Sequence, residues 1–253
     1  MPTAFPFVHL RVNGGRILGK FNLSLPFRMA QFPASFTLGK LMQNLSHAVM
    51  SQRIESRDSA DDFPTPPWAT RALFEHVING KFSKHHSALE PACGRGYMSN
   101  VITEYVGSVE SRDKFDYGFG QKSDFLNNEE TKNFDWIITN PPFKDAESFI
   151  LKSLDICNVG CAFLVRTVFL ESVGRYNRLF SKFPPSAFAQ FVERVPMVKG
   201  RLDSKASTAT GYAWLVWHKT ADSATNVVWI PPCRRALERR FDYPTLDNAL
   251  LLI

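Results

Sequence analysis

The stretch SALEPACGRGYMSNVITEYV, residues 87–106, predicts a strand, a glycine turn and a helix in direct succession. The strand ends at Glu90, and Gly94 and Gly96 allow the chain to turn without a steric penalty. Four side chains then recur at helical spacing on one face: Met98, Val101, Ile102 and Tyr105. A strand that passes through such a turn into a helix indicates an α/β fold.

The alternation of strands and helices continues on both sides of this stretch. Upstream, Thr65 is expected to cap a helix whose first turn holds Pro66 and Pro67, and downstream a helix is expected over 146–156. Further strands are expected at 107–113, near 124–126, and at 136–139, 161–170, 191–198 and 211–219. This order favours a mostly parallel sheet with helices on both faces, which binds ligands at the carboxyl ends of its strands.

The composition is that of one globular domain, with 253 residues, 44% of them hydrophobic and 21% charged. No apolar run approaches the roughly 20 residues that span a bilayer, so we expect a soluble, cytoplasmic protein. The four cysteines form no Cys-x-x-Cys pair, which predicts free buried thiols rather than a disulfide framework or a metal site.

Charge is distributed unevenly along the chain. Residues 1–54 carry six basic residues and no acid, residues 55–156 have a net charge of −6, and residues 157–240 one of +8. The basic second half favours a polyanionic partner, and solvated side chains without a partner are the alternative.

Three parts are expected along the chain. Residues 1–60 have the composition of a basic, poorly structured arm or a targeting segment, and internal methionines also allow a start further downstream. A catalytic domain is expected over 61–225, with its basic, substrate-facing part at about 170–210, and a C-terminal extension over 226–253.

A second informative stretch, DWIITNPPF at 135–143, runs from a buried strand into an Asn-Pro-Pro-Phe quartet at 140–143. Its two prolines lock φ and remove two backbone donors. In a parallel sheet this strand end lies at the same edge as Glu90, Asp113 and Asp124, so one crevice is expected to collect them all.

These segments resemble the S-adenosylmethionine-dependent amino-methyltransferases that carry an (Asp/Asn/Ser)-Pro-Pro-(Tyr/Phe) signature. The cofactor segment is EPACGRG at 90–96, and FPTPPW at 63–68 precedes it. The order of the segments is similar to that in the gamma class of adenine DNA methyltransferases, and RTVFLES, ERVPM and TATGYAWLVW resemble small phage and prophage members. The resemblance covers about 61–220. It implies a Rossmann-like class I methyltransferase with a mostly parallel seven-stranded sheet, S-adenosylmethionine as cofactor, and a bacterial or phage origin.

The resemblance also implies roles around the cofactor. Glu90 would balance its ammonium group, Thr65 would hold its carboxylate, and Gly94 and Gly96 would let the backbone approach its methionine part. The full set expected to bind the cofactor is Phe63, Thr65, Pro66, Glu90, Pro91, Ala92, Gly94, Gly96, Asp113, Asp124 and Phe125.

Two of the acids in this set have alternatives. Asp113 is favoured for the ribose hydroxyls, although Glu110 and Asp116 lie in the same segment. Asp124 would accept from the adenine amino group of the cofactor, with Phe125 beside the ring, and a turn cap is the alternative for Asp124.

The quartet suits the activation of an amino group that is conjugated to a ring. The amide oxygen of Asn140 and the carbonyl of Pro141 would accept both amino hydrogens, so that the nitrogen lone pair points at the methyl donor. Pro142 keeps this carbonyl rigid, and Phe143 would stack on a planar base.

The expected substrate is the N6 group of adenine in DNA, presented as a flipped base. The alternatives are a ribosomal RNA base, at adenine N6 or guanine N2, a protein glutamine, or nucleic-acid binding without catalysis. No large target-recognition domain follows the catalytic core, which leaves strict sequence specificity open. The basic residues expected to contact nucleic acid are Arg175, Arg178, Arg194, Lys199, Arg201 and Lys205.

Overall fold

The computed structural model describes residues 61–78, 80–129, 133–220 and 224–243, together with two short strands near the N-terminus. The chain divides into two units, Met1–Gln52 and Arg53–Ile253. In the first unit, β1 (Arg11–Val12) pairs with β2 (Gly15–Arg16) in antiparallel fashion. The rest of the expected basic arm lies outside the described residues.

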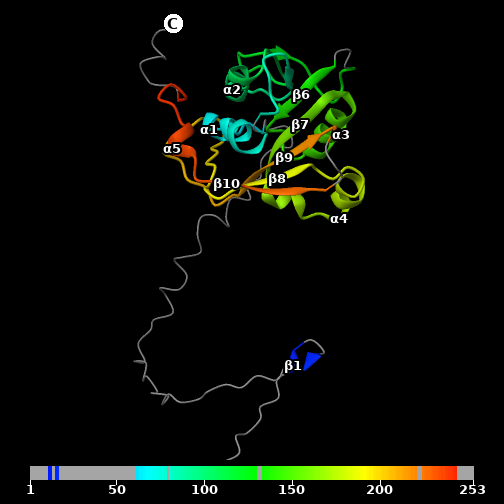
Figure 1. Ribbon diagram of the computed structural model, residues 1–253. Helices are drawn as coiled ribbons and strands as arrows, with labels where there is room; N and C mark the ends of the chain where they lie inside the picture. Colours follow the sequence, from blue (N-terminus) through cyan, green and yellow to red (C-terminus); the bar gives the residue numbers. More distant parts are fainter. Residues whose placement is uncertain are drawn as a thin grey trace, which may run out of the picture. The chain divides into compact units, whose positions relative to one another are not determined.

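An eight-stranded sheet forms the centre of the second unit (Figure 1). Its strand order is β10-β8-β9-β7-β6-β3-β4-β5. The strands are β3 (Ser87–Glu90), β4 (Ser108–Asp113), β5 (Gln121–Lys122), β6 (Phe134–Thr139), β7 (Cys157–Arg166), β8 (Ala187–Phe191), β9 (Tyr212–His218) and β10 (Asn226–Ile230).

All strands of this sheet except β9 run in the same direction. β3 to β7 pair in parallel, β9 is antiparallel to both β7 and β8, and β10 is parallel to β8. The carboxyl ends of β3, β4, β6, β7 and β8 therefore meet at one edge of the sheet, and the connection into β9 starts from that edge. The structure thus confirms the expected Rossmann-like α/β fold with a mostly parallel sheet.

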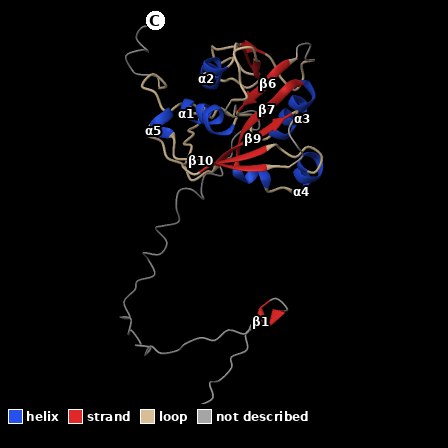
Figure 2. Cartoon of the chain, in the orientation of Figure 1, coloured by secondary structure: helices blue, strands red, loops and turns tan. Residues whose placement is uncertain are grey.

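Helices cover both faces of the sheet (Figure 2). They are α1 (Pro67–Ala72), η1 (Leu73–Val77), α2 (Tyr97–Tyr105), α3 (Ala146–Ile156), η2 (Thr167–Leu170), α4 (Val173–Arg175), η3 (Tyr176–Phe180) and α5 (Arg234–Leu237). Side chains of β6 alternate between two hydrophobic clusters, because Trp136 and Ile138 pack with α1 and α2 whereas Ile137 packs with α3. This alternation buries the strand on both faces.

Several element boundaries differ from those expected. The helix at 146–156 is confirmed, and the third strand, expected near 124–126, lies at 121–122. Residues 167–170, however, form a 3₁₀ turn instead of continuing β7. β8 ends at Phe191, ahead of the expected 191–198, where Pro196 cannot donate to a ladder.

Two further differences concern the two ends of the domain expected over 61–225. Thr65 does not cap α1, since the N-cap is Pro66 and lacks a side-chain bond. The sheet has eight strands instead of seven, because residues 226–230, expected in an extension, form β10 at its edge.

A buried arginine joins the C-terminal part to α1. Arg71 is 4% exposed and donates to both carboxylate oxygens of Glu104 on α2, at 2.9 and 3.0 Å. It also donates to both carboxylate oxygens of Asp242, at 2.8 and 2.9 Å. Bidentate pairs of this kind fix the orientation of the guanidinium, so the chain near residue 242 is held against α1 and α2.

None of the helices in the described ranges is long and apolar enough to cross a membrane.

Candidate active site

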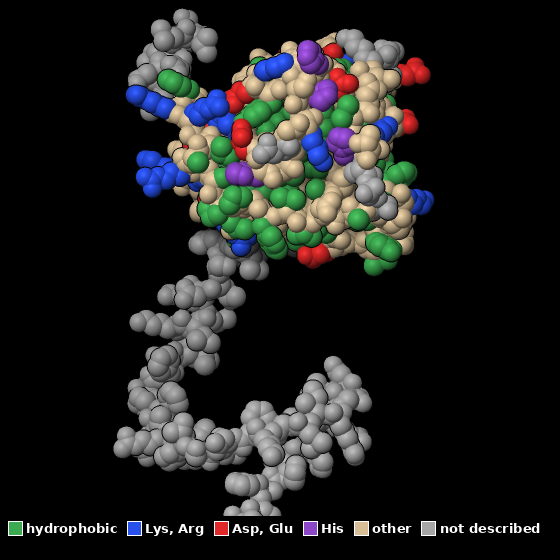
Figure 3. All heavy atoms as spheres, viewed as in Figure 1, with side chains coloured by type: hydrophobic (Ala, Val, Ile, Leu, Met, Phe, Trp, Pro, Cys, Tyr) green, Lys and Arg blue, Asp and Glu red, His purple; other side chains and the backbone are tan. Residues whose placement is uncertain are grey.

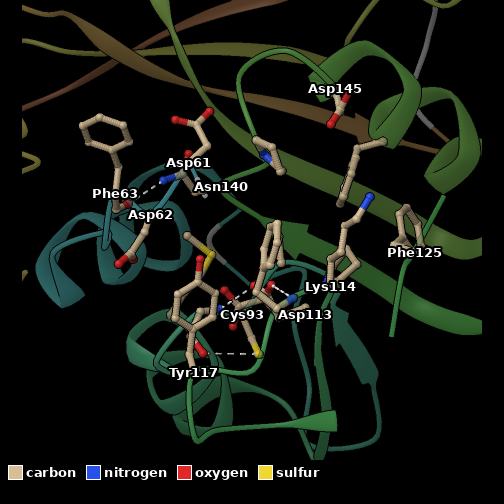
Figure 4. A pocket seen from close by; sticks show the side chains of 18 of the residues that line it. Asp61, Asp62, Phe63, Cys93, Asp113, Lys114, Tyr117, Phe125, Asn140 and Asp145 are labelled. Carbon is tan, nitrogen blue, oxygen red and sulfur yellow. Dashed lines mark hydrogen bonds between the residues drawn. The ribbon is translucent and has the colours of Figure 1, made fainter. Parts of the chain in front are cut away.

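A cavity of about 470 Å³ lies where β3, β4 and β6 end (Figure 4). This volume falls within the roughly 300–1,000 Å³ of small-molecule sites. Its charged lining consists of six acids and three bases, namely Asp61, Asp62, Glu90, Asp113, Asp124, Asp145, Arg95, Lys114 and Lys144. An excess of carboxylates favours a ligand that carries positive charge.

The glycine turn after β3 forms one wall of the cavity. Gly94 lines it with a φ of +52°, and a Cβ added there would meet no atom within 4 Å, so the backbone is open to a ligand. Gly96 does not line the cavity, and a Cβ there would lie 2.4 Å from the ring of Phe119. The φ of +81° at Gly96 serves the start of α2, where Gly96 is the N-cap.

Glu90 closes β3 and is 2% exposed. Its Oε2 accepts from the hydroxyl of Ser99, which in turn lies 2.6 Å from the hydroxyl of Ser111. Burial raises the pKa of Glu90 to about 8 because the charged form is poorly solvated, and the Ser99 bond offsets this only partly. Next to it, Pro91 and Ala92 also line the cavity. A cationic group in the cavity would be needed to keep the Glu90 carboxylate ionised at neutral pH.

Asp113 closes β4 and faces the same cavity. Its carboxylate accepts from the backbone N–H of Gly94 and of Phe115, both at 2.9 Å. Burial raises the pKa of Asp113, and these two bonds act in the opposite direction. Glu110 instead pairs with Arg112 at 2.5 Å and does not line the cavity. Of the two acids, the structure brings Asp113 to the cavity.

Asp124 also lines the cavity but closes a turn at the same time. It accepts from the Leu126 N–H at 3.2 Å and the Asn127 amide at 2.8 Å, and pairs with Lys114 at 3.0 Å. Burial alone would raise the pKa of Asp124, but the bonds from Lys114 and Asn127 outweigh it and lower the pKa. Both uses considered for Asp124 are thus compatible with its position. Phe125 is 3% exposed and lines the cavity beside it.

The segment before α1 lies against the quartet that follows β6. Asn140 donates through Nδ2 to the carbonyl of Phe63 and to Oγ1 of Thr65, both at 3.1 Å (Figure 4). Thr65 and Phe63 therefore orient Asn140, although both also line the cavity as expected for cofactor residues. Pro66 is buried and does not line it.

These two bonds decide which way the Asn140 amide points. A carbonyl oxygen can only accept, so reversing the amide would place two acceptors against each other. Oδ1 of Asn140 is buried, and among the described residues it has no hydrogen-bond partner. Because buried polar atoms are nearly always bonded, this free acceptor marks a position for a ligand donor.

The remainder of the quartet is fixed by neighbouring loops. Pro141 is buried and Pro142 lines the cavity. The N–H of Phe143 donates to Asp61 at 2.7 Å. The guanidinium of Arg166 lies 3.6 Å from the centre of the Phe143 ring, so it covers one face of this ring in the structure.

The basic residues expected at a nucleic-acid surface fall into two groups. Arg175 and Arg178 both lie near Glu147 of α3, and the closer pair, Arg178 with Glu147, is 2.6 Å apart. The other four belong to the connection between β8 and β9: Arg194, Lys199, Arg201 and Lys205. Figure 3 shows further basic side chains gathered over α5, which the sequence did not single out.

The connection between β8 and β9 borders the candidate site. The N–H of Gly200 donates to the carbonyl of Asp62 at 2.8 Å, and the sulfur of Met197 lies 3.7 Å from the amide of Asn140. Arg201 is exposed and pairs with Asp203 at 3.1 Å. A polyanion held by this connection would therefore lie next to the quartet.

Three residues that line the cavity, Asp62, Arg95 and Tyr117, were not singled out from the sequence. Asp62 pairs with Arg95 at 2.6 Å, and Arg95 lies 5.4 Å from the ring of Tyr117. Together they line one side of the cavity. Only the double acid before the Thr-Pro segment hinted at this arrangement.

No family model and no curated protein matches the sequence. Among solved structures, the chain is similar to a Listeria monocytogenes protein described as a class I S-adenosylmethionine-dependent methyltransferase. The two share 15% identity with a TM-score of 0.48, over 77% of this chain and 71% of that one. It is also similar to a modification subunit assigned to a type I restriction enzyme of Vibrio vulnificus, with 15% identity and a TM-score of 0.49 over 78% of this chain. A dimethyladenosine transferase of Plasmodium falciparum has 14% identity and a TM-score of 0.42, over 61% of this chain and 62% of that one. The chain spans 53% of the length of the Vibrio vulnificus subunit.

Proposed function

We propose that this chain transfers a methyl group from S-adenosylmethionine to an exocyclic amino group, and that its substrate is the N6 amino group of adenine in DNA. The observation that carries the proposal is the buried, unpartnered Oδ1 of Asn140, whose direction is set by Phe63 and Thr65. It stands at the carboxyl end of β6, on the wall of the acidic cavity.

The cavity fits the proposed cofactor by its shape and its charges. Gly94 leaves space for the methionine part, and Glu90 supplies a carboxylate for its ammonium group. Asp113 retains acceptor capacity for the ribose hydroxyls, because a carboxylate offers about four acceptor positions and the backbone N–H groups of Gly94, Lys114 and Phe115 do not use all of them. Asp124 and Phe125 also line the cavity, and in this proposal they contact the adenine ring of the cofactor.

The cofactor supplies an electrophilic methyl group on a positively charged sulfur. The protein must make the adenine amino group a better nucleophile, since its lone pair is delocalised into the ring. Oδ1 of Asn140 accepts one amino hydrogen and the carbonyl of Pro141 the other, which favours a pyramidal nitrogen with its lone pair directed at the methyl carbon. In the proposed reaction the new nitrogen–carbon bond would replace the carbon–sulfur bond of the donor, and the amino group would release one proton to solvent.

Presentation of the base requires that it leave the duplex, because a stacked adenine cannot reach a site at the end of β6. In this proposal the connection between β8 and β9, which contacts Asp62 and Asn140, holds the phosphate backbone during this step. Phe143 supplies an aromatic face, and the guanidinium of Arg166 that covers it would have to move for a base to stack there.

A methyl-transfer assay with tritiated cofactor tests the proposal. DNA, ribosomal RNA and ribosomal protein are offered in parallel, together with a DNA in which every adenine is replaced by a base without the N6 group. We expect transfer to adenine-containing DNA alone. Label on RNA or on protein would refute the proposed substrate but keep the amino-methyl chemistry.

Asn140→Ala tests the catalytic role directly. We expect this variant to bind cofactor with unchanged affinity and to lose roughly a hundredfold or more in the rate of a single turnover. Asn100→Ala, which changes an exposed asparagine on α2, is the matched control and should keep its activity. An Asn140→Ala enzyme with most of its activity would show that the side chain is only a turn residue.

A further inference from the structure

The segment 61–65 contacts both ends of the Asn-Pro-Pro-Phe quartet. At one end, the carbonyl of Phe63 and the hydroxyl of Thr65 hold the side chain of Asn140. At the other end, the carboxylate of Asp61 accepts from the backbone N–H of Phe143 at 2.7 Å. The ring of Phe63 also lies 5.4 Å from the ring of Phe143. Alternate residues of one short segment thus hold the whole quartet.

The bond from Asp61 has particular weight because of the two prolines. Pro141 and Pro142 have no N–H, so Phe143 provides the first backbone donor after Asn140 with which the loop can be anchored. A hydrogen bond to a carboxylate is shorter and stronger than one between neutral groups. The rigid proline ring between them transmits the position of the Phe143 amide to the carbonyl of Pro141, the second acceptor proposed for the amino group.

The neighbouring acid is used differently. Asp62 directs its carboxylate to Arg95 at 2.6 Å and its carbonyl to the N–H of Gly200 at 2.8 Å. Figure 4 shows Asp61 beside Asn140, whereas the carboxylate of Asp62 lies on the side of Tyr117. The two adjacent carboxylates therefore serve different loops, which makes Asp62 a matched control for Asp61.

We propose that Asp61 is a positioning residue of the transfer reaction: it fixes the backbone of the quartet through the Phe143 amide and thereby places the Pro141 carbonyl. This inference rests on the proposed function for its catalytic consequence. The placement of the loop itself does not depend on which substrate is methylated.

Amide hydrogen exchange at Phe143 tests the placement without any assay of activity. We expect the amide to be protected in the wild-type protein and to exchange at least about tenfold faster in Asp61→Ala. Asp61→Asn should retain the protection, because its side-chain oxygen can accept the same bond. Asp62→Asn removes a negative charge one residue away and should leave Phe143 as in the wild type. Equal protection in Asp61→Ala and the wild type would overturn the inference, whatever the activity.

The catalytic consequence is measured in single turnovers at saturating cofactor. We expect Asp61→Ala to lose about tenfold to a hundredfold in rate, with cofactor affinity within about twofold, and Asp61→Asn to recover most of the rate. A wild-type protein that transfers no methyl group would refute the proposed function and leave the exchange experiment to decide on Asp61. An active Asp61→Ala enzyme with a fast-exchanging Phe143 amide would refute the positioning role alone.

Discussion

If the buried carboxyl group of Glu90 balances the ammonium group of the cofactor, as proposed, cofactor binding should depend on pH in a direction that follows from the pKa of Glu90. Burial raises its pKa to about 8 in the free protein, so most molecules carry a protonated Glu90 at neutral pH. If the ammonium group of the cofactor binds only the ionised form of Glu90, the apparent affinity equals the intrinsic affinity multiplied by the fraction of molecules in which Glu90 is ionised. With this pKa the reduction is roughly tenfold at pH 7 and about a hundredfold at pH 6.

Titration calorimetry between about pH 5.5 and 7 measures this effect, in a range below the titration of an α-amino group. Affinity should rise by close to tenfold for each pH unit. In two buffers with different ionisation enthalpies, the heats should report about 0.9 proton released for each cofactor bound at pH 7. Glu90→Gln resembles the protonated form, so it should bind weakly at every pH and release no proton from this site.

The matched control is Glu110→Gln, which removes a carboxylate on the neighbouring strand outside the cavity and should keep the wild-type pH dependence. The stability of the free protein gives a second, independent readout. A carboxyl group whose pKa is raised on folding stabilises the fold at low pH. For Glu90 the free energy of unfolding should fall as pH rises from about 4.5 to about 8, by up to about 1.4 kcal/mol per pH unit. A wild-type affinity that does not change with pH, or a Glu90→Gln variant that keeps the slope, would refute the reasoning.

Three further outcomes are expected. Gly94→Val should abolish cofactor binding measured by calorimetry. Gly118→Val is the control: it imposes similar backbone strain, at a φ of +76°, but lies outside the cavity lining and should bind cofactor normally. Arg71→Met should destabilise the fold by about 3–5 kcal/mol in urea unfolding, because the carboxylate of Asp242, whose side chain is 6% exposed, loses its ion pair with Arg71, and a loss below about 1 kcal/mol would contradict this. Alanine replacement of three basic residues between β8 and β9 should weaken binding to DNA of any sequence and leave cofactor affinity unchanged. The slope of log affinity against log salt concentration should flatten by up to roughly 0.9 for each lost phosphate contact. An unchanged slope would show that these side chains are merely solvated. These residues are Lys199, Arg201 and Lys205.

The central part of the fold was predictable because its signals are local. The spacing of apolar residues between 146 and 156 gave α3 with its observed bounds, and the Gly94 turn followed directly from the sequence. β10 was missed because three of its five residues are exposed at the edge of the sheet and only Ile230 is buried, so no run of buried residues marks the strand. Trp229, for example, is 66% exposed.

The site was predicted as a set of residues but not as a set of contacts. Placing Asn140 and Glu90 at one edge required only the rule that parallel strands end together. The use of Thr65 and Asp61 to hold the quartet could not be read from the sequence, because these residues lie 75 or more positions away from their partners. Likewise, no pattern in the sequence indicates that the ring of Phe119 occupies the space beside Gly96.

The ion pair between Arg71 and Asp242 affects when α1 can pack during synthesis of the chain. α1 is among the first described elements to be synthesised, yet one of the two carboxylate partners of its buried guanidinium lies 171 positions further along the chain. β8 and β10 are likewise completed late. We therefore expect α1 to settle into its final position only after residue 242 has been synthesised. Shortened chains that stop before residue 226 would lack both the edge strand and this carboxylate, and would carry an arginine on α1 that has lost one of its partners.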